Sequence, residues 1–110
     1  MVYIADSDGA AVYVYSYAQD YSWYFKNPFT EPKKEYNRYV IAGESFVLND
    51  GAFGLAISPK NFPERYLFFH PLADIKEYAV PLRVIDDYRN FYQNPGNAVS
   101  GAFKVSIFYK

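Results

Sequence analysis

Few residues of this chain have the types and spacing needed for acid–base, nucleophilic or metal chemistry. The single histidine, His70, lies between Phe69 and Pro71, and no serine stands in a Gly-x-Ser-x-Gly elbow. One histidine and no cysteine provide too few ligands for a transition-metal site or a thiol nucleophile. A hydrolase built on His70 is therefore the weakest alternative, and the sequence predicts a protein that is not an enzyme.

Adjacent carboxylates occur at Asp86-Asp87, ahead of a loop rich in oxygen-bearing side chains. In a strand, neighbouring side chains point to opposite faces, so the pair would not share a proton as an acid–base dyad. In a loop, both could turn toward a hard cation such as calcium, which takes several oxygen ligands. Alternatively, one of the two caps a short helix that buries Tyr88, Phe91 and Tyr92 and ends at Gly96.

The last quarter of the chain carries a recognisable order of motifs. These are Leu82-Arg-Val-Ile85, the Asp86-Asp87 pair, Tyr92, Asn94, Asn97 and Ser100-Gly101-Ala-Phe103-Lys-Val105-Ser-Ile107. In this order they resemble the C-terminal end of calcium-dependent galactose-binding bacterial lectins, which are small jelly rolls. In that family an aspartate and asparagines hold calcium and the sugar hydroxyls. The resemblance therefore implies a calcium site at Asp87, Asn94 and Asn97, and no other cofactor is expected.

Tyrosine is abundant, with 13 residues beside 10 phenylalanines and one tryptophan. In the strongest predicted strand valine and tyrosine alternate, so Tyr13, Tyr15 and Tyr17 share one side and the valines the other. If the valines face the core, the tyrosines form an external row. Together with Trp23 and Tyr24 of the following segment, we call this row the tyrosine face. The alternative is that these side chains only cap the core, with their hydroxyls in water.

An exposed row of rigid aromatic side chains suits three kinds of partner. A protein would be held by Tyr and Trp anchors, a glycan would stack on the rings, and single-stranded nucleic acid would stack its bases. The net charge of −1 argues against nucleic acid, which needs a basic groove. The sequence thus predicts a non-catalytic module that binds a protein or a glycan through the tyrosine face. A stoichiometric protein inhibitor or a virion-associated structural protein is the rival, and the same face could form a homo-oligomer.

The elements that must position these residues are short strands separated by Gly, Pro, Asn and Asp. We predict strands over residues 2–5, 11–18, 21–26, 36–42, 44–48, 52–58, 65–70, 80–85 and 101–110. Asn49-Asp50-Gly51 predicts a type I′ hairpin turn, and Gly43 a bulge or tight bend. About eight short strands and little helix predict one all-β domain over residues 1–110, an antiparallel β-sandwich or jelly roll.

The chain shows no targeting segment. Residues 1–6 lack a basic region followed by an apolar stretch and a cleavage site. No apolar run is long enough to span a membrane. By default, the sequence predicts a cytoplasmic protein without a membrane span.

Overall fold

The structure, a computed structural model, describes residues 1–47, 50–74, 76–91 and 102–107. The strands are β1 (Val2–Asp6), β2 (Ala11–Ser16), β3 (Tyr21–Phe25), β4 (Arg38–Ile41), β5 (Glu44–Val47), β6 (Ala52–Ile57), β7 (Tyr66–Pro71), β8 (Lys76–Pro81) and β9 (Lys104–Ile107). One turn of α-helix, α1 (Leu82–Ile85), and two 3-10 turns, η1 (Lys34–Tyr36) and η2 (Tyr88–Asn90), complete the described elements. The prediction of an all-β fold with little helix is confirmed.

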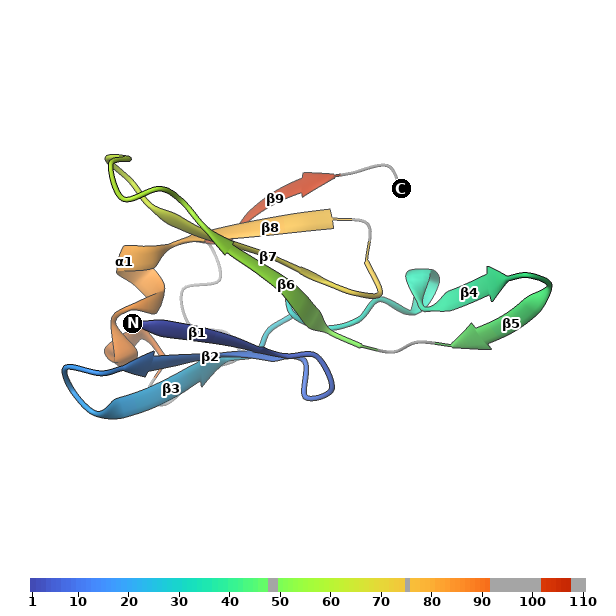
Figure 1. The fold of residues 1–110 in the computed structure, drawn as a ribbon, viewed down its shortest axis with the longest axis horizontal. Helices are drawn as coiled ribbons and strands as arrows, with labels where there is room; N and C mark the ends of the chain where they lie inside the picture. Colours follow the sequence, from blue (N-terminus) through green and yellow to red (C-terminus); the bar gives the residue numbers. More distant parts are fainter. Residues whose placement is uncertain (48–49, 75, 92–101, 108–110) are drawn as a thin grey trace.

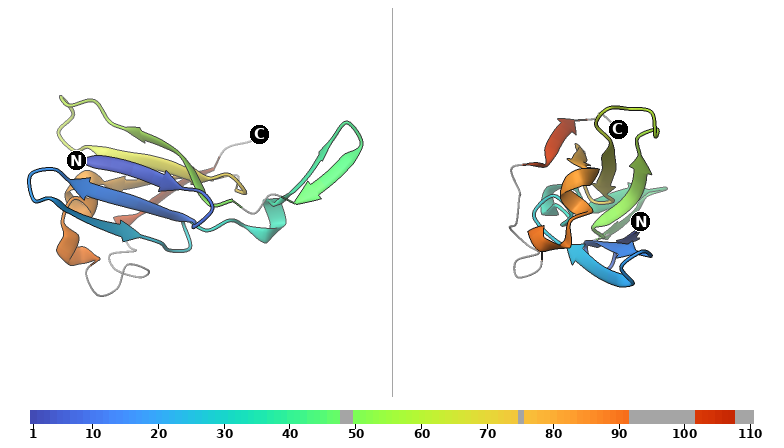
Figure 2. Two further views of the ribbon diagram at one scale, coloured as in Figure 1. Left: turned by 60° about the horizontal axis from the view of Figure 1, so that its bottom comes forward. Right: turned by 90° about the vertical axis from the view of Figure 1, so that its left-hand side faces the viewer.

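Each sheet is an antiparallel meander, in which every strand pairs with the next one along the chain. The sheets have the orders β1-β2-β3, β4-β5 and β6-β7-β8-β9. The two larger sheets lie against each other, while the β4–β5 hairpin projects from one end (Figure 1). The first strands of the two larger sheets, β1 and β6, are neighbours, as two further views show (Figure 2). The two larger sheets thus form two packed layers, which we call the sandwich.

The core lies between the two larger sheets. Val12 and Val14 of β2 are fully buried, so the valine face of the predicted alternation is the one that faces the core. Phe25 of β3 meets Phe69 of β7 edge to face, with ring centroids 5.8 Å apart. The other large side chains buried with them are Trp23, Leu67, Tyr78, Val80, Leu82, Val84, Ile85, Phe91 and Phe103. Aromatic packing across the sandwich thus fixes one sheet against the other.

The turn chemistry differs from the prediction at Asn49-Asp50-Gly51. β5 pairs with β4 and β6 pairs with β7, so the residues between β5 and β6 join two sheets and the predicted hairpin is wrong. The tight turn lies instead at Ala42-Gly43, whose φ angles of 54° and 82° fit a type I′ turn. The prediction of a tight bend at Gly43 is confirmed.

The segment 80–85, predicted to be one strand, is divided between two elements. β8 ends at Pro81, and Leu82 begins α1. Pro81 has φ −60° and ψ 137°, so its backbone is still extended and the helix begins only at the next residue. Leu82, Val84 and Ile85 are all buried, which explains why their apolar run was mistaken for a strand.

Gly51 marks the point where three segments meet. Its N–H donates to the Ser7 carbonyl (2.8 Å), and its carbonyl accepts from the Leu72 N–H (2.9 Å). A Cβ at this position would lie 2.4 Å from the Thr30 carbonyl oxygen and 2.5 Å from the Ala10 Cβ. Only glycine therefore fits without a shift of the backbone.

We expect Gly51→Ala to lower the free energy of unfolding by about 2–3 kcal/mol, since an overpacked site must displace backbone. Gly43→Ala is the control, because a Cβ there meets nothing within 4 Å and has only the positive φ to accommodate. It should cost about 1 kcal/mol. Urea denaturation of both variants measures the difference, and equal losses would contradict the steric argument.

Candidate functional site

Asp86 follows α1 directly and lines two surface cavities. The first has a volume of about 390 Å³ and is lined by Gln19, Asp86, Asp87, Tyr88 and Arg89. The second has a volume of about 330 Å³ and is lined by Pro63, Glu64, Arg65, Leu82, Arg83 and Asp86. We call these two cavities together the Asp86 site. Both are within the size range of small-molecule pockets.

Contacts from α1 and from the β1-β2-β3 sheet hold Asp86 in place. Its N–H donates to the Leu82 carbonyl (2.8 Å), which closes the turn of α1. The preceding carbonyl, of Ile85, accepts a hydrogen bond from the Trp23 Nε1–H of β3 (2.7 Å). Tyr3 of β1 donates its hydroxyl proton to Asp86 Oδ1 (2.5 Å), across 83 positions of sequence. The second carboxylate oxygen, Oδ2, makes no hydrogen bond among the described residues.

The surroundings of Asp86 favour its neutral form. Burial raises the pKa of the Asp86 carboxyl above its usual range, although the Tyr3 hydrogen bond and the positive charges of the N-terminal amine and of Arg65 act to lower it. Burial, and then the hydrogen bond to Asp86, raise the pKa of Tyr3 as well, so its hydroxyl keeps its proton. A carboxyl whose pKa is moved toward neutrality is suited to accept and release protons.

The neighbouring carboxylate, Asp87, has the opposite environment. Arg89 binds it through two side-chain hydrogen bonds, Nε to Oδ1 (2.9 Å) and Nη2 to Oδ2 (2.8 Å). These contacts lower the pKa of Asp87, and its side chain also accepts the Arg89 N–H at the start of η2. The predicted capping role is therefore confirmed for Asp87. Adjacent carboxylates with divergent pKa values mark Asp86 as the candidate proton acceptor.

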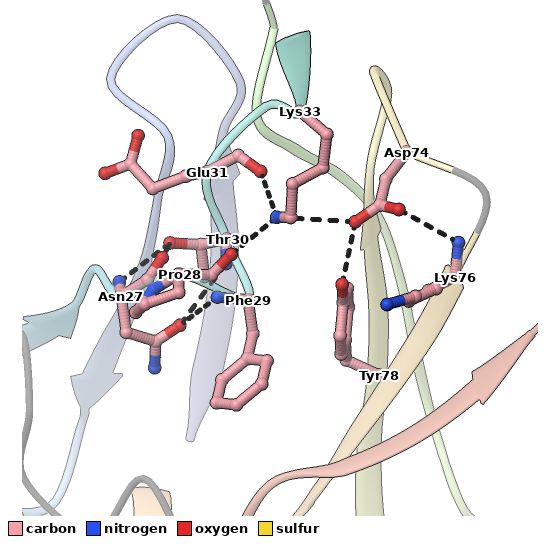
Figure 3. Close-up of polar contacts among 9 residues, drawn as sticks. All are labelled: Asn27, Pro28, Phe29, Thr30, Glu31, Lys33, Asp74, Lys76 and Tyr78. Atoms are coloured by element: carbon pink, nitrogen blue, oxygen red, sulfur yellow. Dashed lines mark hydrogen bonds and ion pairs between the residues drawn. The ribbon is translucent and has the colours of Figure 1, made fainter. Parts of the chain in front are cut away.

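A second polar cluster lies at the end of the sandwich opposite α1 (Figure 1), beside the turn between β7 and β8 (Figure 3). Asp74 is only 1% exposed; its Oδ2 accepts from the Tyr78 hydroxyl (2.8 Å) and lies 3.4 Å from Lys33 Nζ. Lys33 Nζ also donates to the carbonyls of Pro28 (2.6 Å) and Glu31 (2.8 Å). These groups satisfy one another, so the cluster fastens the loop after β3 to the second sheet.

The residues predicted to form the tyrosine face have different environments in the structure. Tyr13 and Tyr24 are 37% and 43% exposed, and their ring centroids lie 5.5 Å apart. Tyr15 donates its hydroxyl to Asp20 Oδ1 (2.7 Å), and Tyr17 stands in the turn after β2, 84% exposed. Trp23 is buried on the other side of the sheet, so including it in this face was wrong. The exposed aromatic contact is therefore the Tyr13–Tyr24 pair.

The remaining predicted site residues do not come together. Asn94 and Asn97 lie outside the described residues, and the Asp87 carboxylate is bound by Arg89. Within the described ranges, no three His, Cys, Asp or Glu side chains are grouped so that they could hold a metal ion. His70 lies on β7 with its Nδ1 3.2 Å from Glu77 Oε2. Burial raises the pKa of Glu77, against the attraction of His70.

Comparison with known proteins places the chain in a family. A family model described as major royal jelly protein matches residues 1–105. The chain belongs to the major royal jelly protein family. The resemblance to galactose-binding lectins is therefore wrong, and the calcium site that it implied at Asp87, Asn94 and Asn97 loses its basis. The Phe-x-Val-x-Ile ending that suggested it is an ordinary strand pattern, in which alternate residues face the same side.

Several relatives in the major royal jelly protein family are similar over most of this chain. Dopaminechrome tautomerase of Drosophila melanogaster is 36% identical over 73 residues, 66% of this chain and 16% of that protein. Major royal jelly protein 6 of Apis mellifera is 34% identical over 79 residues, 72% and 17% of the two chains. L-dopachrome tautomerase yellow-f of Drosophila melanogaster is 32% identical over 89 residues, 80% and 21%. The chain thus spans about a fifth of the length of these relatives, or less.

These relatives correct two predictions. Two of them are named as tautomerases, so the prediction that the protein is not an enzyme conflicts with the activity of its family. Others are named for royal jelly, which is a secretion, so the default assignment to the cytoplasm is wrong. Among the helices of the described residues, none has the length and apolar character needed to cross a membrane.

Proteins of the major royal jelly protein family are β-propellers, and this chain corresponds to part of one. Propeller blades are four-stranded antiparallel sheets set radially around a central channel. The β6-β7-β8-β9 sheet has the strand order of one blade, and β1-β2-β3 provides three strands of another. The contact between β1 and β6 is what the innermost strands of adjacent blades would make.

The Asp86 site could not be recognised as a unit from the sequence. The Asp86-Asp87 pair is conspicuous there, but the lectin resemblance pointed to Asp87. Tyr3 and Arg65 were missed, because neither has a local motif and both reach Asp86 only through the packing of the two sheets. The one available signal was a carboxylate directly after the buried run that ends at Ile85.

Proposed function

We propose that this chain contributes the Asp86 site to a tautomerase that acts on dopachrome-like compounds. The observation that carries the proposal is the carboxyl of Asp86, which borders two cavities and whose burial favours proton uptake. The names of two relatives, dopaminechrome tautomerase and L-dopachrome tautomerase, supply the substrate class. A site that moves protons without a redox step agrees with this class.

A tautomerase moves a proton from one atom of its substrate to another, with no net oxidation or reduction. In the proposed reaction the Asp86 carboxylate accepts a proton from a ring carbon of the substrate, through the Oδ2 atom that Tyr3 does not engage. The electron pair of the broken C–H bond moves through the conjugated ring to a quinone oxygen. That oxygen gains a proton from Asp86, or gains one from water while Asp86 releases its own proton to water. Tyr3 is a positioning residue, because it fixes the carboxylate through Oδ1.

The direct test is turnover of the two named compounds by the protein that contains this chain. Dopaminechrome and L-dopachrome should each lose their quinone absorbance faster than in buffer alone, and each product should have the same mass as its substrate. Loss of mass, or consumption that requires an added oxidant, would contradict a tautomerase. No acceleration with either compound would overturn the proposed function.

The pH dependence of the rate follows from the raised pKa of Asp86. The carboxylate is the proton acceptor, so activity should be absent where Asp86 is protonated and should rise as pH increases through its pKa. Because that pKa lies above the ordinary aspartate value, the rising limb of kcat/KM should be displaced upward from the value of about 3.9 for a free side chain. A rate that is flat across the acid range would exclude Asp86 as the base.

The Tyr13–Tyr24 pair supports a second role, contact with protein. The two rings are exposed on the side of the β1-β2-β3 sheet that faces away from the core, and aromatic side chains of this kind are enriched at interfaces. Because the family folds as a propeller, we propose that the partner is a neighbouring sheet of the same polypeptide. Nothing in the comparisons supports a glycan at this position.

Substitution by lysine should show whether the Tyr13–Tyr24 pair is covered by another sheet or exposed to solvent. If another sheet covers the pair, Tyr13→Lys places an unpaired charge in an interface and should lower the free energy of unfolding by about 2 kcal/mol or more. Tyr17→Lys is the control, because Tyr17 is 84% exposed in a turn. It should change stability by less than about 0.5 kcal/mol. Similar small changes in thermal unfolding for both variants would show that the pair is bare.

A further inference from the structure

The cavity of about 330 Å³ in the Asp86 site contains a guanidinium that the fold does not neutralise by direct contact. Arg65 Nε and Nη2 both donate to one carbonyl, that of Ser58, at 3.3 and 3.2 Å. Among the described residues, Arg65 makes no ion pair within 4.0 Å. The positive charge of Arg65 nevertheless acts to lower the pKa of Asp86, which lines the same cavity.

The other arginine of this cavity is in a different situation. Arg83 Nε lies 2.8 Å from Glu64 Oε1, and the Arg83 side chain is 71% exposed. Its charge is therefore compensated by a carboxylate at the rim. The contrast leaves Arg65 as the cation of the cavity that is available to an anionic group of a ligand.

Building on the proposed function, we infer that Arg65 binds the carboxylate of the substrate and gives the Asp86 site a preference for carboxylated compounds. L-Dopachrome carries a carboxylate on its five-membered ring, whereas dopaminechrome is the same ring system without it. Arginine recognises carboxylates through paired, charge-assisted hydrogen bonds. Because Arg65 and Asp86 line one cavity, a carboxylate held by Arg65 would bring the ring carbons beside it toward the proton acceptor.

Comparing kcat/KM for the two substrates distinguishes a loss of specificity from a loss of activity toward both. Arg65→Gln should lower kcat/KM for L-dopachrome by about 10- to 100-fold, the usual loss for a hydrogen bond to a charged group. It should change kcat/KM for dopaminechrome by less than about 3-fold. In Arg83→Gln, the matched control from the same cavity, the ratio of the two kcat/KM values should remain that of the unaltered protein. Equal losses for both substrates in Arg65→Gln would mean that Arg65 only supports the Ser58 carbonyl, and the inference would be overturned.

A binding measurement keeps this inference testable even if neither substrate is turned over. Indole-2-carboxylate and indole differ only by the carboxylate, and titration calorimetry gives the affinity of the intact protein for each. The carboxylate should bind about 10-fold tighter or more, and Arg65→Gln should remove that difference while Arg83→Gln keeps it. Equal affinities in the unaltered protein, or a preference that survives Arg65→Gln, would refute the role of Arg65. Absence of turnover with the preference intact would instead count against the tautomerase alone.

Discussion

Replacing Asp86 by Asn should reduce kcat/KM for dopachrome-like substrates by about 100-fold or more, since a positioned general base contributes that much to proton transfer. The Asn side chain can still accept the Tyr3 hydrogen bond, so the geometry of the site should be kept while its basicity is lost. Initial rates at several substrate concentrations measure the effect. A fall in kcat with little change in KM would place the loss in the chemical step.

Two comparisons make this prediction specific. Asp87→Asn changes the adjacent carboxylate, which is bound by Arg89, and should leave the rate within about 3-fold. Tyr3→Phe removes the group that positions the carboxylate and should give an intermediate loss, because the base itself remains. Similar losses in Asp86→Asn and Asp87→Asn would show that the site responds to total charge, and Asp86 would no longer be the base.

Stability provides a check that Asp86→Asn has not merely unfolded the protein. The pKa of Asp86 is raised in the fold, so the neutral carboxyl is favoured there and its stabilising effect is lost as pH rises through that pKa. Asn carries no charge at any pH. Relative to the unaltered protein, Asp86→Asn should therefore become more stable as pH rises from acid to neutral. If Asp86→Asn is inactive but at least as stable as the unaltered protein, the loss of activity is not due to unfolding. Functional residues often lower the stability of the fold, so this outcome is expected for a catalytic residue.

Replacing Lys33 by Ala should cost about 3 kcal/mol of unfolding free energy, because it removes the ammonium group that lies 3.4 Å from the buried Asp74 carboxylate. Lys33 Nζ also satisfies two backbone carbonyls of the loop after β3, so the loss combines a charge and two hydrogen bonds (Figure 3). Urea denaturation gives the value. The same experiment on Lys26→Ala should show less than about 1 kcal/mol, because the Lys26–Glu31 pair is long and exposed.

A double-mutant cycle tests whether the stability lost in Lys33→Ala arises from the loss of the ion pair with Asp74. Asp74→Asn removes the charge but keeps an acceptor for the Tyr78 hydroxyl. In the background of Asp74→Asn, Lys33→Ala should therefore cost less than it does alone, with a coupling of about 1 kcal/mol or more. Additive losses would contradict the ion pair and leave only the loop hydrogen bonds as the cause.

The fold class could be read from the sequence because strand signals are local. In β2 the valines and tyrosines alternate, so the pattern predicts that they occupy opposite faces, and the structure shows that the face of Val12 and Val14 is the buried one. Turn signals were less reliable. The Asp-Gly motif at Asp50-Gly51 is chemically suited to a hairpin, but the close packing of Gly51 against Thr30 and Ala10 comes from segments far away in the sequence.

The candidate site could not be predicted because identical residue types occupy opposite environments. Asp86 and Asp87 are neighbours in the chain, yet burial raises the pKa of one and Arg89 lowers that of the other. The partner that distinguishes them most, Tyr3, is 83 positions away. Only the packing of the two sheets brings it there, and no periodicity in the sequence records that packing.

The β4–β5 hairpin should unfold locally at a lower free energy than the two packed sheets. Among the described strands, its two strands pair only with each other, and the hairpin projects away from the sandwich (Figure 1). Val40 and Val47 are exposed on it. A two-stranded ribbon of this kind is marginally stable by itself. Its backbone amides should exchange with deuterium well before those of β7, and proteases should cut there first. The Ala42-Gly43 turn is accordingly the position at which a peptide tag could be inserted with the least disturbance to the Asp86 site.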